Sequence, residues 1–325
     1  TAVRSSARVL VGRQAGIPVL FFPFHRHGFA GAAGLGHAIG GPVNDVQGVI
    51  ARGDLQLDAR TLMRAAGLSL LSLKHAVGSD PVFSAGNPGA VTRHAGHVID
   101  LSAGFAAYEQ ERTAFAKSAF KAIRTRQGKA ETQYGPVRHV FCDADPASLD
   151  ALMRWKHQQF TATGQTNVLE VGWVNALVRT LLARGAASAL RVQLSSLFFG
   201  DRRVAAHIGL RTPTTLHYWF PAYDADVQEL SPGNILLYRM AQEAAREGVR
   251  QIHLGAGDYR YKHEFANCSM PLIATTVLAP SWPGRVAEAG QRLVGALERG
   301  LPVRLAPLPG GVLRRLDRHL AFRAL

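Results

Sequence analysis

The pattern of hydrophobic and polar positions predicts a chain in which strands and amphipathic helices alternate. Two segments in the second half are rich in β-branched and apolar residues, as strands are, and a tight Gly200-Asp201 turn joins them. A third strand, rich in aromatic residues, is followed by a segment with apolar residues at helical spacing and then by a short strand. The strands are expected at 189–199, 203–211, 215–220 and 251–254.

The helix between the last two of these strands has a start and a stop signal. Ser231 suits the N-cap, and Pro232 suits the first helical position, where its missing N–H costs nothing. Gly248 ends the helix. The free N–H groups at such a start, with the helix dipole behind them, suit a pyrophosphate. The alternative is an ordinary capped helix followed by a polar loop. One face of this helix is apolar: Ile235, Leu236, Met240 and Ala244.

The first half of the chain also shows a strand pair, then helices and single strands. No close internal repeat is visible, but strand pair, helix and strand occur in both halves, and we place a domain boundary near residue 144. The expected elements are strands at 8–11, 17–24, 68–73, 96–101 and 137–141, a Gly-rich loop at 28–41, and helices at 58–66, 103–130, 149–160 and 171–184.

The charge of the chain indicates an anionic partner. Lys and Arg number 37 against 23 Asp and Glu, which gives a net charge of +14. Such a field attracts nucleic acid, anionic lipid or a phosphorylated cofactor. No nucleic-acid-binding motif is present, so nucleic acid is disfavoured, although tRNA stays open. The segment 312–325 has a basic amphipathic pattern that suits a membrane surface, and the alternative is a terminal helix docked on its own domain.

Cysteine usage and hydropathy indicate a cytoplasmic protein. Two cysteines in 325 residues argue against a disulfide framework and form no CxxC metal pair. No apolar run reaches the roughly 18 residues that span a bilayer. We expect no signal peptide at this N-terminus, although the sequence begins at Thr1 without a Met.

Several motifs that suggest other functions are incomplete. The pairs Gly34/Gly36 and Gly255/Gly257 lack the full GxGxxG and the acidic residue of a dinucleotide site. His25 with His27, and His94 with His97, have no third ligand nearby in the sequence. We therefore expect neither a nucleotide fold of that type nor a metal.

The order of the elements in the second half carries a family resemblance. Antiparallel strands, a helix after the third and then another strand form the core of the GNAT acyltransferase fold. The chain resembles the cellulose-biosynthesis (CelD/BcsL-like) acetyltransferases, relatives of the FemAB peptidyltransferases. The matching segments are Val204-Ala-Ala-His-Ile-Gly209, Leu230-Ser-Pro-Gly-Asn-Ile-Leu-Leu237 and Gly257-Asp-Tyr-Arg-Tyr-Lys262. Gly41–Ile50 also resembles an early element of that family, with Val46 where an aromatic residue is commoner.

The resemblance implies an α+β fold of tandem GNAT-like domains, of which the second is the more complete. On this basis residues 1–144 form a degenerate GNAT-like domain on the acceptor side. Residues 145–282 form the acyl-CoA-binding domain, and residues 283–325 form a basic, amphipathic helical extension.

The resemblance also implies attack by an amine on the thioester of acetyl-CoA or a longer acyl-CoA. This reaction needs a base for the acceptor ammonium, donors for the oxyanion and an acid for the departing thiolate. Asp258 is the first candidate base, with a turn-capping role as its alternative, and His207 is the second, with a core role as its alternative. Tyr261 is the candidate acid, and Lys262 is a candidate to stabilise the oxyanion or a phosphate.

The binding residues follow from the same resemblance. The pyrophosphate is expected on the backbone of Ser231, Pro232, Gly233 and Asn234. The common GNAT loop, Gln/Arg-x-x-Gly-x-Gly/Ala, is only partly kept in Gln228–Gly233, which puts the cofactor in doubt. The acyl or acceptor cleft is expected along His217, Tyr218 and Trp219.

The resulting hypothesis is an acyl-CoA-dependent N-acyltransferase that modifies an amino group of an envelope polysaccharide or lipid-linked precursor. It would be cytoplasmic, or peripheral on the inner face of the membrane. Three alternatives stay open: long-chain N-acylation of a lipid amine as in bacterial ceramide synthases, transfer from aminoacyl-tRNA, and a catalytically inactive scaffold.

Overall fold

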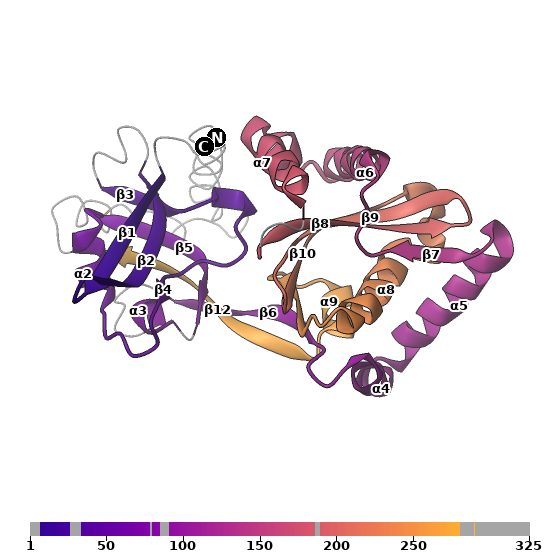
Figure 1. Ribbon diagram of the computed structural model, residues 1–325, viewed down its shortest axis with the longest axis horizontal. Coiled ribbons are helices and arrows are strands. Elements are labelled where there is room, and N and C mark those ends of the chain that lie inside the picture. The colour runs from indigo at the N-terminus through magenta and orange to yellow at the C-terminus, as the bar shows by residue number, and fades with distance from the viewer. Residues whose placement is uncertain are drawn as a thin grey trace, which may run out of the picture. The chain divides into compact units, whose positions relative to one another are not determined.

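The computed structural model describes residues 7–26, 34–78, 80–84, 91–185 and 189–279, together with residue 289. These residues form the α+β fold that the sequence predicts (Figure 1). They divide into two compact units: unit 1 comprises 1–94 and 271–325, and unit 2 comprises 95–270. The boundary that we expected near residue 144 therefore falls inside unit 2. Except for residue 289, the expected extension at 283–325 lies outside the described residues.

Unit 1 is a sheet with the strand order β1-β2-β3-β5-β12, and β4 also pairs with β2. Its core contains Phe22, Leu62, Met63, Leu71 and Phe83, which are almost fully buried. The strands are β1 (Ala7–Gln14), β2 (Ile17–Arg26), β3 (Leu35–Ala38), β4 (Ile50–Ala51), β5 (Leu70–Val77) and β12 (Cys268–Leu278), and the helices are η1 (Gly41–Val43), α2 (Ala59–Ala65) and α3 (Pro81–Ser84).

Strands β3, β4 and β12 of unit 1 differ from the sequence prediction. The Gly-rich segment that we expected to be a loop contains β3, which pairs in parallel with β5. We did not predict β12, which pairs antiparallel with β5 from Leu272 to Leu278. Both pairings are with strands distant in the sequence. The β12 pairing returns the chain to unit 1, and this is why the units do not follow one another along the sequence.

Unit 2 is a sheet with the strand order β6-β11-β10-β9-β8-β7. Figure 1 shows α6 and α7 on one face of this sheet and α5, α8 and α9 on the other. The strands are β6 (Thr92–Asp100), β7 (Val137–Val140), β8 (Arg191–Phe199), β9 (Arg202–Arg211), β10 (Thr215–Tyr223) and β11 (Gln251–Gly255), and the helices are α4 (Phe105–Phe115), α5 (Lys117–Tyr134), α6 (Pro146–Thr163), η2 (Val168–Glu170), α7 (Gly172–Ala183), η4 (Ala225–Leu230), α8 (Pro232–Arg246) and α9 (Arg260–Phe265).

The single helix that we expected at 103–130 is two helices. The break lies at Ala116, which has φ −120° and ψ 47°. Arg112, near the end of α4, is buried and donates hydrogen bonds to the carbonyl oxygens of His263 and Glu264 at 3.1 Å. These bonds hold α4 against α9. The sequence around Ala116 contains no Gly or Pro, so the break comes from packing and not from local propensity.

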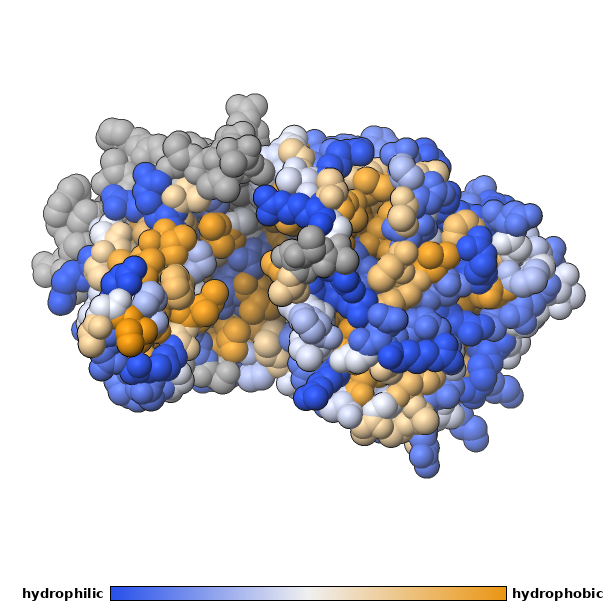
Figure 2. All heavy atoms as spheres, viewed as in Figure 1, coloured by the Kyte–Doolittle hydropathy of each residue, from blue (hydrophilic) through white to orange (hydrophobic). Residues whose placement is uncertain are grey.

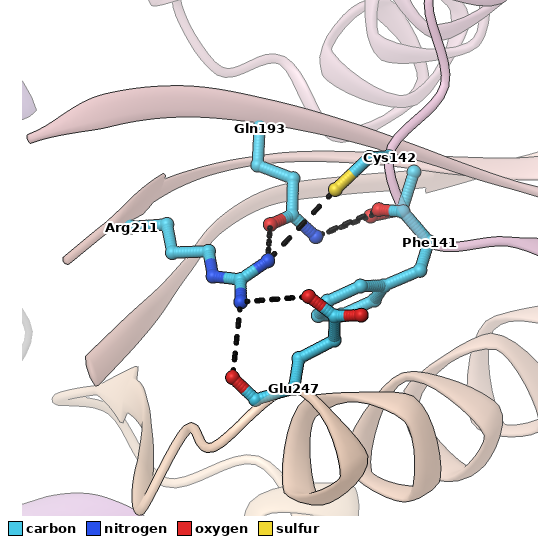
Figure 3. A network of polar contacts seen from close by, with 6 residues as sticks. Phe141, Cys142, Gln193, Arg211 and Glu247 are labelled. Carbon is cyan, nitrogen blue, oxygen red and sulfur yellow. Dashed lines mark hydrogen bonds and ion pairs between the residues drawn. The ribbon is translucent and has the colours of Figure 1, made fainter. Parts of the chain in front are cut away.

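A buried arginine ties the far end of α8 to the sheet (Figure 3). Arg211 of β9 is only 4% exposed. Its Nη1 donates to Gln193 Oε1 at 3.2 Å, and its Nη2 lies 3.4 Å from both the carbonyl oxygen and the Oε2 of Glu247. A cation at a helix C-terminus is favourable because of the helix dipole. This network fixes α8 at one end, and α8 begins at the candidate site.

Candidate active site

The parallel strands β10 and β11 separate after a short ladder. They pair only from Thr215↔Gln251 to His217↔His253, although β10 continues to Tyr223 and β11 to Gly255. On its other side, β10 changes register against β9 between His217 and Phe220. Beyond His217, the ladder between β10 and β11 therefore ends, and the two strands separate. We call this opening the fork.

Helix α8 begins against the end of β10. A Cβ added to Gly233 would lie 3.4 Å from Cδ1 of Tyr223 on that strand. Pro232 occupies the first turn, and the backbone carbonyl of Ser231 accepts from Asn234 N at 3.0 Å and from Ile235 N at 3.2 Å. The predicted helix start is confirmed. A side-chain cap by Ser231 is not, because this residue is left-handed (φ 50°) and its hydroxyl makes no capping bond.

The segment after β11 is not wholly a loop, since it contains the short helix α9. Lys262 of α9 is 5% exposed, and its Nζ donates to the carbonyl oxygen of Ala256 at 2.5 Å. The same Nζ lies 5.4 Å from the ring centre of Tyr259. Lys262 therefore holds the turn that follows β11. Tyr261 is partly buried against the core of unit 2.

The residues that we expected to line the acceptor cleft lie on different sides of β10. His217 and Trp219 are partly exposed, and their rings are 6.4 Å apart. Tyr218 is buried and stacks on the ring of His207 at 4.4 Å. Burial raises the pKa of Tyr218 well above 10, and nearby Tyr261 raises it further. Tyr218 thus packs in the core, with the phenol of Tyr261 close to it.

The two residues that we considered as bases lie in opposite environments. His207 is fully buried, and burial, with smaller effects from His217 and His139, lowers its pKa well below 6.5. Asp258 is 93% exposed and forms an ion pair with Nε2 of His263. The carboxylate of Asp258 therefore faces solvent. His207 in turn is enclosed away from solvent.

A half-buried histidine that we had considered only as a metal ligand lies at the end of β11. His97 of β6 pairs with Gly255, and its ring is 4.6 Å from that of His263. Burial lowers the pKa of His97 below 6.5, as do the positive charges of His263 and Lys262, whereas Asp258 raises it. His97 is therefore neutral at pH 7 and can accept a proton. No local sequence signal connects it to α9.

Comparison with known proteins agrees with this geometry. Residues 117–263 match the family model described as "Acetyltransferase (GNAT) domain". This segment is a GNAT acetyltransferase domain. It contains β7 to β11, the fork, α8 and most of α9. The chain is accordingly an acyltransferase, and its GNAT domain lies within unit 2.

Solved structures show a similar fold at low sequence identity. The crystal structure of FemX has a TM-score of 0.54 at 7% identity, over 84% of this chain and 88% of that chain. A conserved protein of unknown function from Bacteroides thetaiotaomicron has a TM-score of 0.51 at 11% identity, over 83% and 85%. A tandem GNAT protein from the clavulanic acid biosynthesis pathway has a TM-score of 0.45 at 10% identity, over 86% of each chain. The sequence has no significant match among curated proteins.

Neither a metal-binding cluster nor a membrane-spanning helix is present among the described residues. In the part of the chain that the structure describes, no group of three His, Cys, Asp or Glu residues could hold a metal ion. Among the described residues, no helix combines the length and hydrophobicity that a bilayer span requires. Both cysteines, Cys142 and Cys268, are free and exposed.

Proposed function

We propose that the chain transfers an acyl group from acyl-CoA to an amino group of an envelope polysaccharide or lipid-linked precursor. The observation that carries the proposal is the fork between β10 and β11 beside the start of α8, inside the GNAT domain. The separation of β10 from β11 beyond His217 offers a place for the pantetheine arm of the donor. A cytoplasmic enzyme working at the inner face of the membrane fits this acceptor and the net charge of +14.

The start of α8 suits the pyrophosphate of the donor. Gly233 leaves space where a larger residue would approach Tyr223, so a phosphate can come close to the backbone. Helix N-termini favour phosphates because their first N–H groups are free and the dipole is positive there. In this proposal the N–H of Gly233 binds the pyrophosphate. Ser231, Pro232 and Asn234 shape the turn around it, since Pro232 has no N–H and the N–H groups of Ser231 and Asn234 donate to the carbonyl oxygens of Gln228 and Ser231.

Residues of β6 and α9 take the catalytic roles in this proposal. His97, neutral at pH 7, accepts the proton of the acceptor ammonium directly or through water. Tyr261 gives its phenolic proton to the departing thiolate. Lys262 and the Asp258–His263 pair position the turn after β11 and set the charge around His97. His217 and Trp219 line the entrance for the acceptor. His207 supports Tyr218 from within the core.

Donor binding is tested by thermal melting with CoA, acetyl-CoA and palmitoyl-CoA at one ionic strength. A ligand at about 100 times its dissociation constant stabilises the native state by roughly 2.7 kcal/mol. We expect all three to raise the melting temperature. A much larger shift with palmitoyl-CoA would identify a long-chain donor and favour lipid N-acylation. No shift with any of them would contradict the proposal and favour aminoacyl-tRNA or a scaffold.

The substitution Gly233→Ala tests whether the pyrophosphate of the donor binds at the start of α8. The added methyl meets Tyr223 Cδ1 at 3.4 Å, an ordinary contact, so the variant should fold but hinder the pyrophosphate. We expect the melting shift with CoA to fall by more than half. Gly172→Ala is the matched control, since Gly172 starts α7 and its Cβ would meet nothing within 4 Å. Equal CoA-induced melting shifts in the two variants would show that the start of α8 does not bind the donor.

The pH dependence of kcat/KM tests His97 as the base. The rate requires neutral His97, so it should fall as pH drops through the pKa of that group, which lies below 6.5. His263→Gln removes a neighbouring positive charge, makes protonation of His97 easier and should move this fall to higher pH. Asp258→Asn should move it to lower pH. Shifts in the same direction, or none, would exclude His97.

A further inference from the structure

Unit 1 carries a concentration of exposed hydrophobic residues. Figure 2 shows hydrophobic residues gathered where Figure 1 places β1, β2 and β4. In the described part of the chain, the exposed large hydrophobic residues of unit 2 are dispersed over its elements, whereas most of those of unit 1 lie on the paired strands β1, β2 and β4. Those of unit 1 are Val9, Val11, Ile17, Phe21, Val46 and Ile50.

The pairing of the strands makes these residues one surface. Val11 pairs with Phe21, and Phe21 pairs with Ile50, so the three lie side by side across β1, β2 and β4. Val9 pairs with Pro23 on the same face, because alternate residues of a strand point the same way. Ile50 is 68% exposed and Val9 is 55% exposed. We call Val9, Val11, Phe21, Pro23 and Ile50 the hairpin face.

An apolar hollow continues from the hairpin face. It has a volume of about 310 Å³ and includes Pro23 and Ile50 of that face. Its other lining residues are largely aliphatic, among them Ile39, Val46 and Val49. The face and the hollow together provide apolar surface next to space that a hydrocarbon chain can enter. Contiguous apolar surface of this kind marks an interaction site.

The charged residues around the hairpin face are mostly basic, which indicates an anionic partner. Arg13 follows Val11 on β1 at the two-residue spacing of one face, and Arg52 comes directly after β4, where its side chain pairs with Asp54 and donates to Gln14. Between residues 7 and 94 the only acidic residues are Asp45, Asp54, Asp58 and Asp80, of which Asp80 is buried and Asp54 pairs with Arg52. The basic residues in the same range are twice as many: Arg8, Arg13, Arg26, Arg52, Arg60, Arg64, Lys74 and Arg93.

This combination favours an anionic lipid surface over a second copy of the chain. Two hairpin faces brought together would also bring together their arginines, and like charges repel. A lipid bilayer offers an apolar interior below a layer of headgroups, and anionic headgroups attract Lys and Arg. Apolar side chains above a basic rim are typical of segments that lie in the interface of a membrane.

We propose that the hairpin face docks the protein on anionic membranes, with Phe21 and Ile50 inserted among the acyl chains and Arg13 and Arg52 at the headgroups. This inference stands apart from acyl transfer. It concerns a surface of unit 1, whereas the proposed reaction takes place on residues of unit 2.

The test is co-sedimentation of the full chain with vesicles of phosphatidylcholine and phosphatidylglycerol, and with vesicles of phosphatidylcholine alone. Wild-type protein should bind the anionic vesicles, and added salt should weaken the binding. Phe21→Ser/Ile50→Ser should lower the partition coefficient at least tenfold. Leu190→Ser is the matched control, because Leu190 is 51% exposed but lies outside the hairpin face. It should bind as wild type does.

Each contrary result overturns the inference. Wild-type protein that does not sediment with anionic vesicles has no such docking surface. A double variant that binds as wild type does, with an unchanged melting temperature, docks through another segment of the chain. Wild-type protein that is dimeric by light scattering, with a monomeric double variant, uses the hairpin face to bind a second copy. These three outcomes do not depend on CoA binding. They test the hairpin face even if unit 2 binds no CoA.

Discussion

Tyr261→Phe is expected to lower kcat about a hundredfold, with donor binding unchanged, which is the low end of the effect of removing a general acid or base. Protonation of the sulfur as the C–S bond breaks stabilises the leaving group, so removal of the acid slows this step. The variant keeps the ring, which packs against the core of unit 2, and removes only the hydroxyl. The rate can be followed by release of free CoA thiol with an amine acceptor.

The control for this prediction lies two residues away. Tyr259 is 59% exposed, and its ring is 6.3 Å from that of Tyr261. Tyr259→Phe should keep the wild-type rate, since its hydroxyl is not placed at the leaving group. A thioester with a more acidic thiol should restore much of the rate of Tyr261→Phe, because such a thiolate leaves without a proton. Equal losses in both variants, or no rescue, would remove Tyr261 from this role.

The parts of the site that follow from local sequence were predictable. The start and end of α8 have their own signals, Pro232 and Gly248, and the apolar stripe of α8 is buried as expected. Strands β8 to β10 follow one another through short connections, so their patterns are also local. The resemblance added the chemistry of Tyr261 and Lys262. It could not show that the ammonium group of Lys262 donates a hydrogen bond to the carbonyl oxygen of Ala256.

The contacts between distant segments were not predictable. His97 and His263 lie on β6 and α9 and meet only because β6 pairs with β11. Neither residue has a neighbour in the sequence that marks it as a proton acceptor. The pairing of β12 with β5 in unit 1 was missed for the same reason. The pattern of a strand does not specify which strand it pairs with. Sequence periodicity determines which side of a strand or helix is apolar. Which element packs against that side depends on the complete fold.

Gly209→Ala is expected to lower the free energy of unfolding by about 1–3 kcal/mol or more, the range for overpacking a well-packed core. A Cβ at this position of β9 would lie 2.3 Å from the carbonyl oxygen of His217 and 2.5 Å from Cε1 of His207. The first contact is with backbone and the second with a fully buried ring, so neither can move aside easily. Urea unfolding, followed by circular dichroism, measures the change.

The same substitution should also weaken the site, because the crowded carbonyl belongs to the last residue of β10 that pairs with β11. If Gly209 gives β10 room to change register against β9, then Gly209→Ala distorts the fork, and the melting shift with CoA falls along with stability. Gly128→Ala is the matched control. Gly128 lies inside α5 with nothing within 4 Å of its Cβ, so that change should stabilise by about 0.5–1 kcal/mol. A Gly209→Ala variant with wild-type stability and a full CoA shift would show that the close approach of β9 to His217 is not what opens the fork.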